Sequence, residues 1–131
     1  MAVSKITVVF PYSVETLWDI VTNLEDTSWR SDLSKVEILS ETCFIEYTKS
    51  GYSTRFTVTA NKPLHLWEFD MENRNMVGHW SGLFTAVDEG VRVTFTEQVE
   101  AKRRWMKPFV PGYLKRQQAL YIANLWRKLS E

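Results

Sequence analysis

Residues 76–100, MVGHWSGLFTAVDEGVRVTFTEQVE, predict two β-strands joined by a tight turn. Apolar and polar residues alternate on both sides of Glu89-Gly90, which is typical of an antiparallel hairpin. Counting outward from a two-residue turn places Phe84 opposite Phe95 on one apolar face. The stretch therefore predicts part of an antiparallel sheet with one buried face and one polar face.

Three more turns are predicted before this hairpin, at Ser40-Glu41, Ser50-Gly51 and Asn73-Arg74. The six strands are predicted near residues 35–40, 43–49, 52–60, 64–71, 76–87 and 91–100. Counting from the turns predicts these apolar neighbours: Cys43 with Ile38, Ile45 with Val36 and Phe56, Trp67 with Trp80, and Met71 with Met76. The opposite, polar face is predicted to carry Glu46, Arg55, Thr57, Glu68, Asp70, His79, Arg92, Thr94, Thr96 and Gln98.

Helices are predicted on both sides of these strands. A strand over Ile6–Phe10 comes first, and Ser13 then provides an N-cap for a helix through about Leu24. A second short helical turn is predicted between residues 23 and 34. After Pro108 and Pro111, apolar side chains at helical spacing predict a long helix over about 112–129. The expected fold class is α+β, with a curved antiparallel seven-stranded sheet wrapped around the C-terminal helix.

Length and composition favour one globular domain over residues 1–131. The chain is 44% hydrophobic and 24% charged, and no run approaches the roughly 20 apolar residues of a membrane span. The N-terminus lacks a basic segment before its short apolar run, so it predicts a strand rather than a signal peptide. The single cysteine, Cys43, excludes an internal disulfide and favours a cytoplasmic location.

Charge is distributed unevenly along the chain. Residues 101–131 contain eight Lys or Arg and one acid, a net charge of +7, while the whole chain sums to zero. A basic helix covering an acidic sheet is one interpretation. Attraction to an anionic ligand or membrane surface is the other.

Four stretches resemble the START-like superfamily, also called Bet v 1-like or SRPBCC, and within it the polyketide cyclase/dehydrase-like group. They are Ile6–Thr22 (ITVVFPYSVETLWDIVT), Leu24–Val36 (LEDTSWRSDLSKV), Val87–Glu100 (VDEGVRVTFTEQVE) and Ala119–Leu129 (ALYIANLWRKL). The resemblance implies a helix-grip fold with a pocket between the long helix and the concave sheet. It also implies a hydrophobic or amphipathic small molecule as ligand. None of the four stretches is a catalytic motif.

The hairpin counts predict one pair of polar residues on the inner face. They place His65 and Glu97 on either side of Gly82, on three neighbouring strands, with Glu97 as the only inward acid. A carboxylate facing an apolar interior must be paired, neutral or bound to a ligand. Three interpretations remain open for the pair: a buried contact that fixes the register, ligand recognition, or acid–base catalysis of a cyclisation or dehydration.

Bulky residues on the predicted inner face indicate a modest pocket. Cross-strand packing alone explains the aromatic pair Trp67 and Trp80, although flat walls also suit a planar ligand. The candidate ligand-binding residues are Trp29, Tyr47, Phe56, His65, Trp67, Phe69, Trp80, Phe84, Phe95, Glu97 and Tyr121.

The segment Lys102–Val110, KRRWMKPFV, interleaves cations with apolar residues. It is either a packed connection or a surface that contacts membranes, and exposure of Trp105 and Phe109 distinguishes the two. The acidic remainder of the chain argues against nucleic acid as a partner.

The leading hypothesis is binding of a small hydrophobic or aromatic ligand inside the cell. The alternatives are a cyclase or dehydratase-like enzyme using Glu97 and His65, and a lipid-transfer or membrane-surface module using residues 102–110. The sequence contains no phosphate loop, nucleophile elbow or metal-ligand spacing, so we expect neither a cofactor nor a metal. Monomer and homodimer both remain open.

Overall fold

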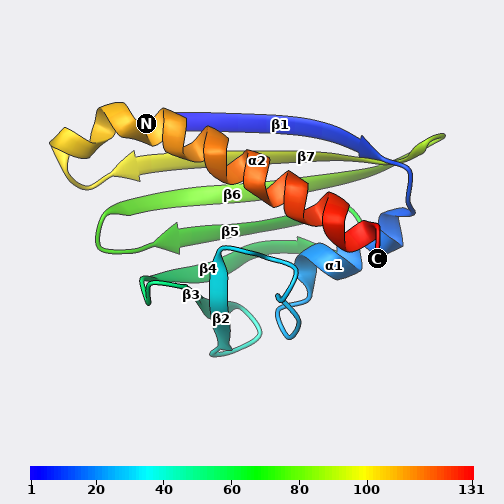
Figure 1. The fold of residues 1–131 in the computed structure, drawn as a ribbon, viewed down its shortest axis with the longest axis horizontal. Helices are drawn as coiled ribbons and strands as arrows, with labels where there is room; N and C mark the ends of the chain where they lie inside the picture. Colours follow the sequence, from blue (N-terminus) through cyan, green and yellow to red (C-terminus); the bar gives the residue numbers. More distant parts are fainter.

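The sheet contains seven antiparallel strands, and one long helix crosses its curved inner face (Figure 1). The computed structural model describes all residues, 1–131. The strands lie in the order β1-β7-β6-β5-β4-β3-β2. Their bounds are β1 Ala2–Phe10, β2 Leu33–Ile38, β3 Cys43–Thr48, β4 Ser53–Lys62, β5 Leu66–Glu72, β6 Met76–Val87 and β7 Gly90–Ala101. The helices are α1 Val14–Thr22, the 3₁₀ helix η1 Arg104–Phe109 and α2 Val110–Leu129. The expected α+β helix-grip architecture is confirmed.

Helix α2 begins two residues before the predicted start and ends where the sequence predicts. Pro111 stands at the start of α2, where its missing N–H costs nothing. Leu114, Gln118, Leu125 and Leu129 are buried and recur at helical spacing, so one face of α2 packs against the sheet. No helix combines the length and the apolar character that crossing a membrane requires.

Helix α1 is confirmed, and the second short helix is not. The Ser13 hydroxyl accepts a hydrogen bond of 3.1 Å from the Thr16 amide and caps α1 as expected. Residues 23–32 form turns instead of a helix. The side chains of Asn23 and Asp26 accept hydrogen bonds from the amides two residues later. These local bonds satisfy the backbone without helix formation.

Strands β5, β6 and β7 keep the predicted inner face but not the predicted partners. Phe69 lies opposite Trp80, and Gly82 lies opposite both Trp67 and Phe95, so each register is shifted by two residues. Met71 lies opposite Gly78 rather than Met76, and Phe84 lies opposite Val93 rather than Phe95. A shift of two leaves every side chain on its face.

The turns explain these two-residue shifts. Between β5 and β6, the Asn73 side chain accepts hydrogen bonds from the amides of Asn75 and Met76, so the loop has more than two residues. Between β6 and β7, the loop is Asp88-Glu89, since Gly90 already pairs with Val87. The φ of Gly90 is +142°, which favours glycine at this position.

Strand β3 has the opposite facing from the one predicted. Phe44 pairs with Phe56 and lies in the core, whereas Ile45 pairs with the exposed Arg55. Cys43 pairs with Thr57 rather than Ile38, and Ile45 opposes neither Val36 nor Phe56. The predicted inward orientation of Ile45 and Tyr47 and the outward orientation of Glu46 were therefore wrong. Cys43 does not have the predicted partner but is buried, as expected.

The flanking loops cause this inversion. Residues 39–43 lie between the last pair of β2 with β3, and residues 48–52 lie between the last pair of β3 with β4, so each connection has an odd number of residues. Gly51, at φ +88°, allows the second of these loops to close. An odd loop shifts the register by one residue and moves each side chain to the other face.

Aromatic side chains fill the space between sheet and helices. Phe69 stacks on Trp80 with ring centroids 4.9 Å apart, and Phe44 stacks on Phe56 at the same distance. Trp18 from α1 meets Phe84 edge to face at 5.1 Å. On the outer face His79 contacts Asp70 at 2.7 Å and Glu68 at 3.4 Å, so that face is polar, as expected.

Candidate functional site

A pocket of about 150 Å³ lies between the sheet and the first half of α2. Its apolar walls come from the central strands. Its polar groups come from the segment before β2, from the strands and from α2. The aromatic residues that line it are Tyr52, Phe56, Phe69, Trp80, Phe95, Tyr113 and Tyr121. The charged residues that line it are Arg30, Glu46 and Glu97.

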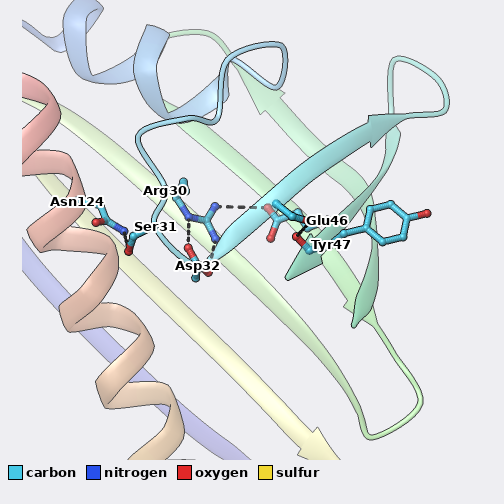
Figure 2. A network of polar contacts seen from close by, with 7 residues as sticks. Arg30, Ser31, Asp32, Glu46, Tyr47 and Asn124 are labelled. Carbon is cyan, nitrogen blue, oxygen red and sulfur yellow. Dashed lines mark hydrogen bonds and ion pairs between the residues drawn. The ribbon is translucent and has the colours of Figure 1, made fainter. Parts of the chain in front are cut away.

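A buried charged network forms one side of this pocket (Figure 2). The Arg30 guanidinium donates two hydrogen bonds to the Asp32 carboxylate, at 3.2 and 3.1 Å. It donates a third, of 3.4 Å, to Glu46 on β3. The two-pronged contact with Asp32 fixes the plane of the guanidinium. Arg30 is thus held in place by carboxylates from two parts of the chain.

Aromatic rings cover the same guanidinium. The Arg30 Cζ atom lies 5.0 Å from the centroid of the Tyr121 ring and 5.8 Å from that of Trp29. Trp29 itself packs edge to face on Tyr121, with centroids 5.2 Å apart. Such cation–π contacts compensate in part for the loss of water around Arg30.

Burial changes the pKa of several of these groups. It would lower the pKa of Arg30, but the nearby Glu46, Tyr121 and Asp32 outweigh it and raise that pKa. The pKa of Glu46 is raised, chiefly by burial, although Arg30 opposes the shift. Burial also raises the pKa of Tyr121 and Tyr113, so both phenols stay neutral at physiological pH.

Glu97 is the second acid of the pocket and differs from Glu46 in having no partner. It lies on β7 directly opposite Trp80. No hydrogen bond or ion pair of the structure involves its carboxylate, whereas Glu46 is bound by Arg30. The pKa of Glu97 is raised to about 7, chiefly by burial and in part by the nearby Glu46, while Arg30 opposes the shift.

Uncharged polar groups surround the remaining pocket surface. The Tyr52 hydroxyl is buried and has no hydrogen-bond partner. The side-chain amide of Gln118 already has hydrogen-bond partners, because its oxygen accepts from the Ser4 hydroxyl and its nitrogen donates to the carbonyls of Ser4 and Phe95. Gln117 and Tyr113, from the same turn of α2, also line the pocket. Tyr52, Tyr113 and Gln117 can therefore contact a ligand, whereas Gln118 connects α2 to the sheet through its hydrogen bonds.

The structure brings together only part of the candidate set. Phe56, Phe69, Trp80, Phe95, Glu97 and Tyr121 line the pocket. Trp67 and Phe84 are buried in the main core and do not reach it. Trp29 also lies outside the pocket lining and instead packs behind Tyr121.

Two further candidates lie away from the pocket. Tyr47 points away from the pocket (Figure 2): its hydroxyl donates a 2.9 Å hydrogen bond to Glu37, and the Lys35 ammonium lies over its ring. His65 is exposed in the turn before β5, where its backbone N–H binds the Lys62 carbonyl. At Leu64 the chain has a φ of +67°, so it turns before the strand begins and His65 never joins the inner face. Glu97 and His65 therefore form no pair.

The sequence analysis missed Arg30, Asp32 and Glu46. Glu46 was assigned to the wrong face by the one-residue error at β3, and Glu97 is therefore not the only inward acid. The cluster of Trp29, Arg30 and Asp32 in a polar segment was an available signal. Its meaning depends on the position of β3, which no local pattern reveals.

Residues 1–129 match the family model described as "Polyketide cyclase / dehydrase and lipid transport". The chain belongs to this family. No curated protein matches it in sequence. A START superfamily protein from Mycobacterium smegmatis has a similar fold, with a TM-score of 0.86 at 14% identity, and the match covers 98% of this chain and 97% of the other.

Two further solved structures share this fold. A protein from Mesorhizobium loti matches with a TM-score of 0.82 at 13% identity, over 98% of this chain and 97% of its own. A conserved protein from Geobacillus kaustophilus matches with a TM-score of 0.80 at 14% identity, over 98% and 93%. The resemblance to the polyketide cyclase/dehydrase-like group is thus confirmed for the family, and the START-like resemblance is confirmed for the fold.

Proposed function

We propose that this protein binds a small hydrophobic or aromatic molecule, inside the cell, in the pocket between α2 and the sheet. The observation that carries this proposal is the set of aromatic walls around a space that the core does not fill. A cavity of about 150 Å³ is large enough for a single aromatic ring. The ligand is therefore expected to be small rather than lipid-sized.

Binding without catalysis is the role that these side chains favour. The acid–base hypothesis named His65 as the partner of Glu97, and His65 lies in an exposed turn instead. Arg30 forms ion pairs with both Glu46 and Asp32. An immobile ion-pair network shapes a pocket better than it transfers protons.

Native mass spectrometry of the protein purified from its host tests the proposal. A retained ligand would add a discrete mass, which the variant Trp80→Ala should lose or change because Trp80 lines the pocket. Leu83→Ala is the matched control, since Leu83 lies on the outer face of the same strand and is 48% exposed. A mass that is retained equally in both variants would argue against this pocket.

A second candidate function, contact with membrane surfaces, is favoured by one observation. Trp105 and Phe109 in η1 are each 68% exposed, although large aromatic side chains are usually buried. Arg103 and Arg104, beside them, form no ion pair, whereas Lys102 and Lys107 are paired with Glu72 and Glu100. Interleaved aromatic and basic groups suit an anionic bilayer.

Vesicle sedimentation tests this second candidate. We expect the protein to sediment with vesicles containing phosphatidylserine and not with pure phosphatidylcholine, and to lose this binding in Trp105→Ala/Phe109→Ala. The control Ile38→Ala/Leu39→Ala removes comparably exposed apolar residues far from η1. Equal binding of both double variants would exclude η1 as the contact.

A further inference from the structure

We propose that the pocket selects an organic cation, such as a protonated amine attached to an aromatic ring, and that Glu97 is its counter-ion. This inference rests on the proposed ligand-binding function and goes further by assigning the charge of the ligand. It follows from the charges around the pocket, from its aromatic walls and from the position of Glu97.

The charges of the site leave one carboxylate without a cation. Arg30 is the only basic residue among those that line the pocket. Its three donated hydrogen bonds all go to Asp32 and Glu46, so none of them reaches Glu97. Glu97 is half-buried, and a carboxylate that is partly removed from water is stabilised by a cationic partner or by protonation. A cationic ligand would supply the missing partner to Glu97.

The walls around Glu97 are suited to a positive charge. Trp80 lies directly opposite Glu97 in the β6–β7 ladder. Its indole stacks on Phe69 at 4.9 Å and on Phe95 at 5.1 Å, so Trp80 shapes the wall and does not offer a free ring face. Tyr121 meets Phe95 edge to face at 5.4 Å. The faces of aromatic rings attract cations, and the attraction grows when water is excluded. Arg30 already uses Tyr121 in this way on the other side of the pocket.

An anionic ligand fits this arrangement poorly. The guanidinium that would bind the carboxylate of such a ligand is already occupied by two acids. The charge of Glu97 would also repel an anionic ligand. A neutral ligand with a carbonyl acceptor is the remaining alternative, because protonated Glu97 can donate one hydrogen bond. The two cases differ in their pH dependence, which makes them separable.

The titratable groups that face Glu97 are few. They are Arg30, Glu46 and Tyr52 from the walls of the pocket, and Tyr113 and Tyr121 from α2. The pKa values of Tyr113, Tyr121 and Arg30 are raised, so these three keep their protons near neutral pH. Binding of a cation should strengthen as Glu97 loses its proton, whereas binding of a neutral acceptor should weaken.

Benzylamine, benzyl alcohol and benzoate form a probe set of matched size. In isothermal titration calorimetry at about pH 8, we expect benzylamine to bind at least about tenfold more tightly than benzyl alcohol, and benzoate to bind most weakly. Glu97→Gln should remove the preference for benzylamine over benzyl alcohol. Glu68→Gln, on the outer face, should leave all three affinities unchanged.

The wild-type pH dependence supplies a test that needs no variant. Benzylamine, which stays protonated over this range as a lysine side chain does, should bind roughly tenfold more tightly at about pH 8 than at about pH 5.5. Equal affinity for benzylamine and benzyl alcohol, or a preference that survives Glu97→Gln, would overturn the inference while leaving ligand binding intact. Failure of all three probes to bind would instead contradict the single-ring pocket and, with it, this inference.

Discussion

Glu97 lies directly opposite Trp80 in the ladder between β6 and β7, and both side chains line the pocket. The indole provides a wall, and the carboxylate next to it has no polar partner. Strand pairing therefore places the least satisfied charge of the pocket beside one of its largest aromatic side chains. The stability of this arrangement leads to the first prediction.

Glu97→Gln should stabilise the protein at alkaline pH and have little effect at acidic pH. The folded-state pKa of about 7 exceeds the ordinary 4.5, so the folded state binds this proton more tightly than the unfolded state. The associated stability is fully present below about pH 4.5 and is lost as pH rises towards 7. We expect the variant to exceed the wild type by about 1–3 kcal/mol at pH 8 in urea denaturation, with no difference near pH 4. A wild type that is the more stable protein at pH 8 would mean that Glu97 has a partner.

Trp80→Ala should enlarge the pocket and cost about 3–5 kcal/mol in the free energy of unfolding. Trp80 is buried and stacks on both Phe69 and Phe95, so its removal leaves a large void. Leu83→Ala on the outer face should cost less than about 1 kcal/mol. Urea denaturation measures both. A cost below about 1 kcal/mol for Trp80→Ala would show that its ring borders open space only.

Gly82→Ala should destabilise the protein, because the Trp80 indole lies across Gly82. A Cβ at residue 82 would come within 2.7 Å of one indole carbon and 2.9 Å of another. We expect a loss of about 1–3 kcal/mol and a change in the near-ultraviolet circular dichroism as the indole shifts. In Gly112→Ala the nearest atom is 3.8 Å away, at the flexible end of Arg116. That control should be neutral or stabilising by up to about 1 kcal/mol, since alanine favours the helix. A neutral Gly82→Ala would contradict the described position of Trp80.

Arg30→Met should destabilise the protein by about 2–4 kcal/mol, because it leaves Glu46 and Asp32 unpaired in a largely buried position. Adding Glu46→Gln should recover part of this loss, since one of the two uncompensated carboxylates is then removed. Lys128→Met breaks an exposed pair with Glu131 and should change stability by less than about 1 kcal/mol. Additive losses in the double variant would show that Arg30 and Glu46 do not interact.

The architecture could be predicted from the sequence, whereas the composition of the site could not. The apolar face of β5, β6 and β7 survived errors of two residues in register, because side chains repeat every second residue. At β3 the error was one residue, and Glu46 moved from the outer face into the pocket. The number of loop residues decides whether a register error is one residue or two. The sequence of the loops around β3 does not reveal that number.

The position of His65 shows the same limit. It continues the alternation of Leu66–Glu72 on paper, but β5 begins only at Leu66, after the turn in which Leu64 has a positive φ. Arg30 was missed for the converse reason. Its role depends on Glu46 and Tyr121, which lie far from it in the sequence and meet it only in the folded chain.

The six indole N–H groups of the protein report most directly on whether the pocket binds a ligand. In two-dimensional ¹H–¹⁵N NMR, with signals assigned from single Trp→Phe variants, titration with benzylamine should shift the Trp80 indole signal. The exposed Trp105 and Trp126 should remain unchanged, because they lie outside the pocket. Shifts confined to Trp105 or Trp126, with Trp80 unaffected at saturation, would contradict the central claim that this pocket is the binding site.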